Sequence, residues 1–121
     1  MKTHKDLDVW KTAVDLAIDV YKVTRSFPRE ELFGLSAQMR RSAVSIASNI
    51  AEGAARQTSK EFSQFLHVAA GSTSELDTQI EIARGVGIGE GPDLQRLQNT
   101  AARVSMMLQG LIKSVAHSRD L

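Results

Sequence analysis

Apolar residues recur at alternating three- and four-residue steps along most of this chain, which is the spacing of one face of a helix. The last stretch follows it most strictly, as a heptad through Leu94, Leu97, Ala101, Val104, Leu108, Leu111 and Val115. Heptad spacing is typical of helices that pack in left-handed bundles. Nothing in the sequence indicates a strand, so the chain is expected to be all-α.

Four helices are predicted, over residues 7–26, 31–55, 59–85 and 92–116. Phe27-Pro28 ends the first, because a residue before proline is disfavoured in the helical region. Thr58 and Glu61 have the spacing of a capping box at the start of the third helix. Connectors of two to seven residues favour antiparallel neighbours. We therefore expect one domain over residues 1–121, an up-down-up-down antiparallel four-helix bundle.

The buried faces of the first two helices can be proposed from the same spacing. Asp6 is the expected N-cap of the first helix. Its core-facing residues are expected to be Trp10, Ala13, Val14, Ala17, Tyr21 and Thr24. The second helix carries two adjacent apolar stripes and is expected to run through the middle of the assembly. One stripe is Leu32, Leu35, Met39, Ala43, Ile46, Ile50 and Ala54, and the other is Phe33, Ala37, Val44, Ala47, Ala51 and Ala55.

Composition excludes several classes of protein. The chain of 121 residues has no cysteine, which rules out disulfide scaffolds, thiolate metal sites and a cysteine nucleophile. Its 15 Lys and Arg against 14 Asp and Glu give a net charge of +1. This balance argues against a strongly cationic surface for nucleic acid but leaves local patches possible. No signal peptide or membrane span is indicated, so a cytoplasmic protein without a membrane partner is expected.

No constellation of residues indicates catalysis. The glycine-rich stretch at residues 85–91 lacks the Lys-Ser/Thr of a phosphate-binding loop and is interpreted as a connector. His4, His67 and His117 have neither the Glu-x-x-His nor the His-x-x-x-His spacing of metal sites. The Arg–His spacing of small helical ribonucleases of the HEPN type is also absent. We therefore expect no catalytic residue, metal, cofactor or small-molecule substrate.

A polar stripe on the second predicted helix is more informative. Small and hydrogen-bonding residues recur there at three- and four-residue steps, where an outer face would carry Lys and Glu. Two interpretations stay open: a polar layer inside one bundle, or an interface between subunits. The candidates for an oligomer interface are Arg41, Ser45, Asn49, Glu52, Gly71, Ser72 and Glu75.

Basic residues form two local groups, Arg40 with Arg41 and Arg56 with Lys60. Arginine offers a planar fork that binds phosphate, so these four are the candidates for contact with nucleic acid. The alternative is a solvated surface of ion pairs, since Glu52 and Glu61 lie close to the second group in sequence.

A set of short motifs resembles one known family, the bacterial four-helix-bundle proteins named for the 23S rRNA-intervening sequence. The match is dense over about residues 6–85 and looser beyond. It rests on Asp6-Leu7-Asp8-Val9-Trp10 with Ala13, Tyr21, Phe27-Pro28 with Glu31, Gly34-Leu35, Gln38-Met39-Arg40-Arg41-Ser42-Ala43, Ser45-Ile46, Asn49-Ile50-Ala51-Glu52-Gly53, Lys60-Glu61-Phe62, Phe65-Leu66, Ala69, Gly71-Ser72, Glu75-Leu76 and Gln79.

The resemblance implies a four-helix bundle that assembles as a homopentamer. Some members are encoded within intervening sequences of 23S rRNA genes. A related branch, the accessory variability proteins of diversity-generating retroelements, binds nucleic acid and a reverse transcriptase through a basic pentameric barrel. This chain differs in being nearly neutral, which weakens the expectation of phosphate binding.

The sequence therefore predicts a non-catalytic, homo-oligomeric interaction or scaffold protein, pentameric by resemblance. The alternative is an RNA- or DNA-binding accessory factor linked to rRNA or to a reverse transcriptase.

Overall fold

The computed structural model describes residues 3–116. Over that range the chain forms four α-helices and two single turns of 3₁₀ helix. The elements are η1 (His4–Asp6), α1 (Asp8–Thr24), η2 (Arg29–Glu31), α2 (Leu35–Ala54), α3 (Ser59–Val86) and α4 (Gly91–Ala116). The all-α prediction is confirmed, with the second helix beginning four residues later than expected.

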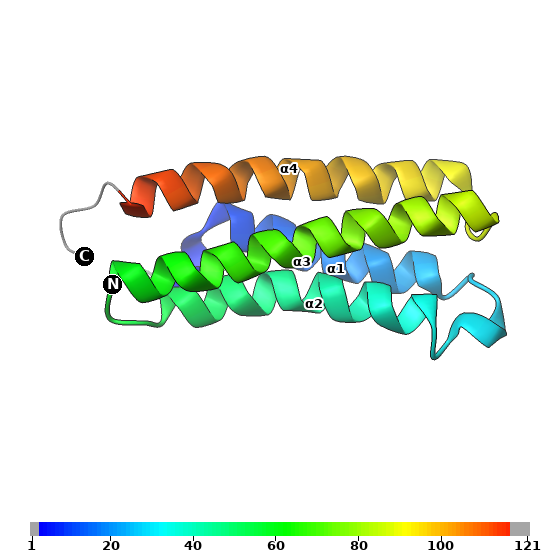
Figure 1. Cartoon of the computed structure of the whole chain (residues 1–121), viewed down its shortest axis with the longest axis horizontal. Coiled ribbons are helices and arrows are strands. Elements are labelled where there is room, and N and C mark those ends of the chain that lie inside the picture. Colours follow the sequence, from blue (N-terminus) through cyan, green and yellow to red (C-terminus); the bar gives the residue numbers. More distant parts are fainter. Residues whose placement is uncertain (1–2, 117–121) are drawn as a thin grey trace.

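The helices lie side by side along the long axis of the molecule and alternate in direction (Figure 1). Each helix packs against the next along the chain, and α4 closes the arrangement against α1. Within the described residues, the diagonal pairs α1–α3 and α2–α4 do not approach each other closely. This is the predicted four-helix bundle.

The core is a continuous column of aliphatic side chains contributed by all four helices. On α2 and α4 its members follow the predicted lines, although Leu35, Ala54 and Leu111 are only partly buried. Leu32 was wrongly assigned to the core, because it lies before α2 and is 49% exposed. The largest fully buried side chains are Leu16, Val20, Met39, Ile46, Ile50, Leu66, Leu76, Ile80, Leu94, Leu97, Val104 and Leu108.

The predicted face of α1 was wrong by about one residue. The buried line is Val9, Ala13, Leu16, Val20 and Val23. Of the expected residues only Ala13 and Thr24 are buried, whereas Tyr21 is 40% exposed. One residue turns a helix by about 100°, so the two stripes lie side by side and α1 buries only the one that faces α2 and α4.

The expectation that α2 runs through the middle of the assembly stays a prediction, because within the described residues α2 packs only on α1, α3 and the short turns η1 and η2. Its first stripe is buried from Met39 to Ile50, but the second faces outward, with Val44 42% exposed. Phe33, which belongs to that stripe, lies before the helix and is 92% exposed. The helix begins at Leu35, whose backbone N–H is capped by the Glu31 carboxylate at 3.1 Å.

One predicted cap is confirmed and one was wrong. The Thr58 hydroxyl accepts the Glu61 backbone N–H at 3.1 Å and donates to the Glu61 carboxylate at 2.9 Å. Asp6 does not cap α1, whose N-cap is Leu7 without a side-chain hydrogen bond. The Asp6 carboxylate instead accepts the backbone N–H of Thr3 at 2.9 Å, which closes the short turn η1.

Only residues 87–90 of the glycine-rich stretch form the predicted connector, because Gly85 and Val86 belong to α3 and Gly91 begins α4. Gly87 has φ of +78° at the end of α3, and the Ile88 N–H reaches back to the Ala83 carbonyl at 2.8 Å. Gly89 has φ of +86°, and a Cβ there would lie 2.9 Å from the Phe27 ring. These two glycines allow the chain to reverse direction between α3 and α4 within a few residues.

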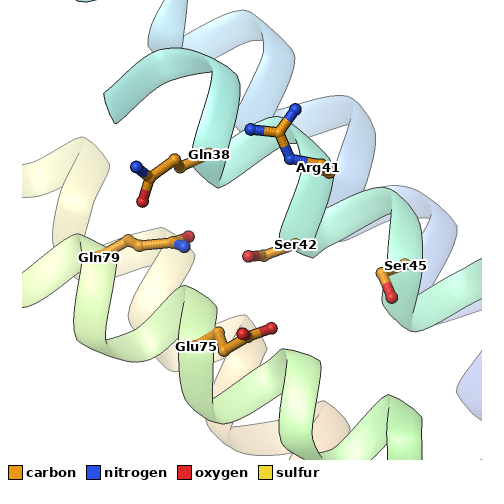
Figure 2. A pocket seen from close by; sticks show the side chains of 6 residues that line it. All are labelled: Gln38, Arg41, Ser42, Ser45, Glu75 and Gln79. Carbon is orange, nitrogen blue, oxygen red and sulfur yellow. The ribbon is translucent and has the colours of Figure 1, made fainter. Parts of the chain in front are cut away.

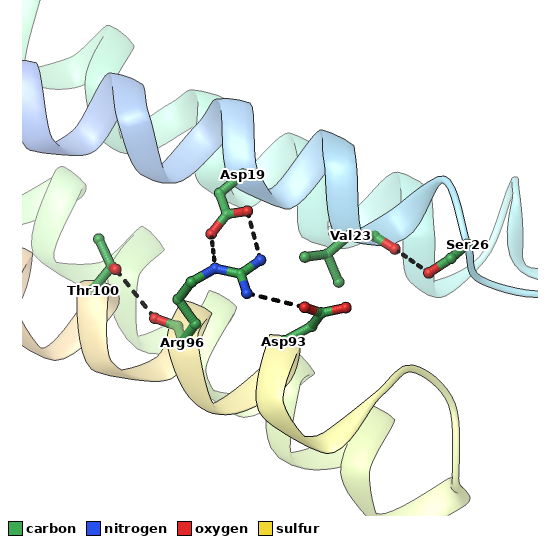
Figure 3. A network of polar contacts seen from close by, with 6 residues as sticks. All are labelled: Asp19, Val23, Ser26, Asp93, Arg96 and Thr100. Carbon is green, nitrogen blue, oxygen red and sulfur yellow. Dashed lines mark hydrogen bonds and ion pairs between the residues drawn. The ribbon is translucent and has the colours of Figure 1, made fainter.

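Polar contacts hold α4 against its neighbours on the surface. Arg96 donates two hydrogen bonds to Asp19 of α1, at 2.8 and 2.9 Å, and a third to Asp93 at 2.9 Å (Figure 3). These bonds, Asp19 foremost, raise the pKa of Arg96 above its ordinary value. Because the guanidinium is half-exposed, the cluster contributes about 1 kcal/mol at most.

The packing of α2 on α3 requires a glycine at position 53. A Cβ there would lie 2.8 Å from Phe65 Cβ and 3.0 Å from the Phe62 ring. We predict that Gly53→Ala lowers the free energy of unfolding by about 1–3 kcal/mol, through overpacking at this crossing. Urea unfolding followed by circular dichroism measures the change at fixed protein concentration.

Gly110→Ala is the matched control, because a Cβ there meets nothing within 4 Å. This variant gains helix propensity and is expected to raise the free energy of unfolding by up to about 1 kcal/mol. Equal responses of the two variants would contradict the packing role of Gly53.

Candidate interaction surface

The predicted polar stripe lines a groove between α2 and α3, here called the α2–α3 seam (Figure 2). It encloses about 320 Å³. Its lining residues are Gln38, Arg41, Ser42, Ser45, Glu75 and Gln79. The sequence thus predicted a real surface feature, and the structure divides it into two parts that behave differently.

One part is a hydrogen-bonded layer within the bundle. The hydroxyls of Ser45 and Ser72 lie 2.9 Å apart and join α2 to α3. The Asn49 amide donates to the Ser45 carbonyl at 2.8 Å and to its hydroxyl at 2.9 Å. For these three residues, the interpretation as an intramolecular polar layer describes the contacts.

The other part of the seam is left without partners. Arg41 and Glu75 are both exposed, and neither forms an ion pair within the described residues. Figure 2 shows the Arg41 guanidinium turned away from Glu75. The Gln79 amide oxygen is buried and receives no hydrogen bond from residues 3–116. These groups have hydrogen-bonding and charge capacity that residues 3–116 do not use.

Two further interface candidates are resolved by their surroundings. Glu52 forms an ion pair with Arg56 at 2.6 Å, one helical turn away on the same surface. Gly71 is exposed, and a Cβ there would meet nothing within 4 Å. No part of residues 3–116 therefore packs closely on Gly71.

Sequence reasoning missed a second surface, between α1 and α2, here called the α1–α2 groove. It consists of two adjoining hollows of about 350 and 500 Å³, which share Tyr21 and Val44 in their walls. Their lining residues are Val14, Ala17, Ile18, Tyr21, Lys22, Arg25, Leu32, Phe33, Ala37, Arg40, Arg41, Val44, Ala47 and Ser48. The outward stripes of α1 and α2 supply its apolar walls, and they could have indicated it had they not been assigned to the core.

The charged residues that line the α1–α2 groove are all basic. Lys22, Arg25, Arg40 and Arg41 line it, and no carboxylate does. The Arg40 guanidinium lies 4.8 Å above the Tyr21 ring and donates to the Thr24 hydroxyl at 2.8 Å, which fixes it at the groove wall. A chain with a net charge of +1 thus places four positive charges on the walls of two adjoining apolar hollows, two in each.

The two basic groups proposed for nucleic acid lie at different places. Arg40 and Arg41 are in the second turn of α2, whereas Arg56 follows its last turn and Lys60 lies in the first turn of α3. Arg56 is held by Glu52 and lies 4.9 Å from the Phe65 ring centre. The structure therefore does not bring these four residues into one patch.

Within residues 3–116, no group of three or more histidine, aspartate or glutamate side chains could hold a metal ion. None of the described helices is long and apolar enough to cross a membrane.

Comparison with known proteins identifies the family of the chain. The family described as 23S rRNA-intervening sequence protein matches residues 5–110. The chain belongs to this family. The match includes α1, α2, α3 and most of α4, and so contains both grooves.

A solved structure supports the fold of this 23S rRNA-intervening sequence protein family member. A Bacteroides thetaiotaomicron protein, described as having unknown function and coming from the S23 ribosomal protein family, superposes with a TM-score of 0.76. The two are 24% identical, and the match covers 87% of this chain and 98% of the other. No curated protein matches the chain.

The hydrogen-bonded layer of the seam gives a direct test. We predict that Ser45→Ala lowers the free energy of unfolding by about 1–2 kcal/mol, because it leaves the buried Ser72 hydroxyl without its partner. Ser48→Ala, on the exposed side of the same helix, should change it by less than about 0.5 kcal/mol. Chemical denaturation of both variants measures these free energies of unfolding. Equal effects would contradict the stabilising role of the hydrogen-bonded layer.

Proposed function

We propose that this family member is a non-catalytic homo-oligomeric interaction protein, in which the α1–α2 groove takes part in joining subunits. The observation that carries the proposal is the set of large apolar side chains along this groove. Phe33 is 92% exposed, and Ile18 and Leu32 are each 49% exposed. Contiguous apolar surface of this kind is typical of a protein contact, since soluble monomers rarely expose it.

The composition of the groove also supports a protein contact. Aromatic and arginine side chains are the residues that contribute most to binding energy at protein interfaces, and Tyr21, Phe33 and Arg40 lie together here. Small residues such as Ala17, Ala37 and Ala47 let another backbone approach. The surface is thus shaped for an apolar partner with an acidic edge.

The number of subunits in the proposal is five, and it comes from the family resemblance. A cyclic pentamer needs a heterologous contact, in which one surface of a subunit meets a different surface of the next. The bundle offers more than one exposed apolar surface, as such a contact requires. A cytoplasmic location is part of the same proposal.

We predict that the wild-type protein sediments as an oligomer at micromolar concentration. Val44→Lys places a charge at the centre of the groove and should shift the protein to monomer. Met106→Lys is the matched control, because Met106 is 75% exposed on α4 and lies outside the groove. Sedimentation equilibrium gives the mass of each species, and a wild-type monomer would refute the proposed function.

The four positive charges of the groove favour a second candidate function, the binding of RNA or DNA. Tyr21 and Phe33 would add stacking surfaces for bases. This candidate predicts binding to structured RNA or duplex DNA that weakens steeply with salt. Each neutralised phosphate contributes about −0.9 to the slope of log affinity against log salt on duplex DNA.

A paired substitution tests this candidate. Arg25→Gln/Arg41→Gln should reduce the slope by about 2, whereas Arg56→Gln/Lys60→Gln, at the other end of α2, should leave it unchanged. A salt-titrated binding assay measures both. Absence of binding by the wild type at low salt would eliminate the candidate.

A further inference from the structure

A second exposed surface with apolar residues runs along the outside of α3. Val68, Ile82 and Val86 are 52%, 49% and 63% exposed, and the exposed residues Gly71 and Glu75 lie among them. We name this set the α3 row: Val68, Gly71, Glu75, Ile82 and Val86. Nothing in its own bundle covers it.

The α3 row is straight enough to act as one ridge. Residues seven apart differ by about 20° around a helix, so Val68, Glu75 and Ile82 lie nearly in line. From Val68 to Ile82 the ridge spans about 21 Å at 1.5 Å per residue. The α2 wall of the α1–α2 groove, from Ala37 to Ser48, spans about 16 Å by the same measure. The ridge is therefore long enough to fill the groove.

The α3 row and the α1–α2 groove also have complementary charges. Glu75 is the one charged residue of the α3 row, and it has no ion-pair partner within the described residues. The groove is lined by four cations and no carboxylate. Arg41, which also has no ion-pair partner among residues 3–116, lines both the groove and the α2–α3 seam. An apolar ridge with a central carboxylate matches an apolar groove with a basic rim.

Gly71 shapes the middle of the α3 row. Glycine within a helix costs about 1 kcal/mol relative to alanine, yet a Cβ at Gly71 would meet nothing in its own chain. The absence of a side chain leaves a notch in the α3 row between Val68 and Glu75. Such a notch admits a bulky side chain from a partner, and Phe33 stands exposed at the groove's edge.

From these observations we propose that the α1–α2 groove of one copy receives the α3 row of a second copy, with Arg41 facing Glu75. The inference rests on the proposed homo-oligomer and names its contact. The α3 row and the α1–α2 groove share no residue, and α3 does not pack against α1 within the described part of the chain. One copy can therefore use both surfaces at once, as a closed ring requires.

A mixing experiment tests this contact. Val44→Lys disables the groove and keeps the row, whereas Val68→Lys/Ile82→Lys disables the row and keeps the groove. Each variant alone is expected to be monomeric. Mixed in equal amounts, they should form a one-to-one dimer that grows no further, because one good groove meets one good row. Sedimentation velocity and native mass spectrometry resolve these species.

Other results would overturn the inference in distinguishable ways. If the row variant assembles like the wild type, the groove binds another groove or a different partner, and only this inference fails. If the mixture stays monomeric, it fails as well. A monomeric wild type removes the proposed function with it. Circular dichroism of each variant confirms the fold, and Met106→Lys should assemble normally.

Charge reversal gives a second, independent measurement. Arg41→Glu and Glu75→Arg should each raise the dissociation constant of assembly at least about tenfold, and the double variant should recover most of the affinity. Independent effects of the two changes would contradict the pairing.

Gly71→Leu separates the interface from the fold. It should raise the unfolding midpoint of the monomeric Val44→Lys variant, through helix propensity, while weakening assembly of the otherwise wild-type chain. Unchanged assembly would exclude the notch from the contact.

Discussion

The packing of α2 against α3 is the contact on which the rest of the structure depends. It is the most extensive helix pair in the bundle. Gly53 lets the two helices approach where they meet, since a Cβ there would lie 2.8 Å from Phe65 Cβ. The Ser45–Ser72 hydrogen bond fixes the same pair further along. With α2 held in this orientation, its buried line is set as Met39, Ala43, Ile46 and Ile50.

That orientation determines what remains outside. A helix in a four-helix bundle has two neighbours and can bury only the sector that faces them. Both α1 and α2 carry more apolar residues than this sector holds. The surplus, including Tyr21 and Val44, meets on the surface between the two helices and forms the α1–α2 groove. The groove is thus a consequence of the packing that stabilises the core.

The same reasoning explains what could be predicted from the sequence. The α4 heptad has a single apolar line, so its buried residues from Leu94 to Val115 were predicted almost completely. In α1 the buried stripe through Ala13 and the predicted stripe through Ala17 are equally apolar and lie side by side. Only the positions of α2 and α4 decide which of the two stripes is buried. The seam was predicted because serines and asparagine on an apolar helix are conspicuous. The groove was not predicted, because its apolar residues have the same helical spacing as core residues. The sequence alone does not show which stripe is buried.

The packing also determines where the charged side chains gather on the surface, and the net charge of +1 does not reveal this distribution. Several carboxylates are engaged elsewhere on the surface: Asp19 and Asp93 by Arg96, Glu52 by Arg56, and Glu81 by Arg84. The Gln98 amide also donates to Glu81 at 2.6 Å and, more than Arg84, lowers the pKa of that carboxyl. None of these acids lines the α1–α2 groove, so its cations are not neutralised there. A balanced chain can therefore present a basic groove and, on another helix, an unpaired Glu75, which is the arrangement that two copies of one chain need to recognise each other.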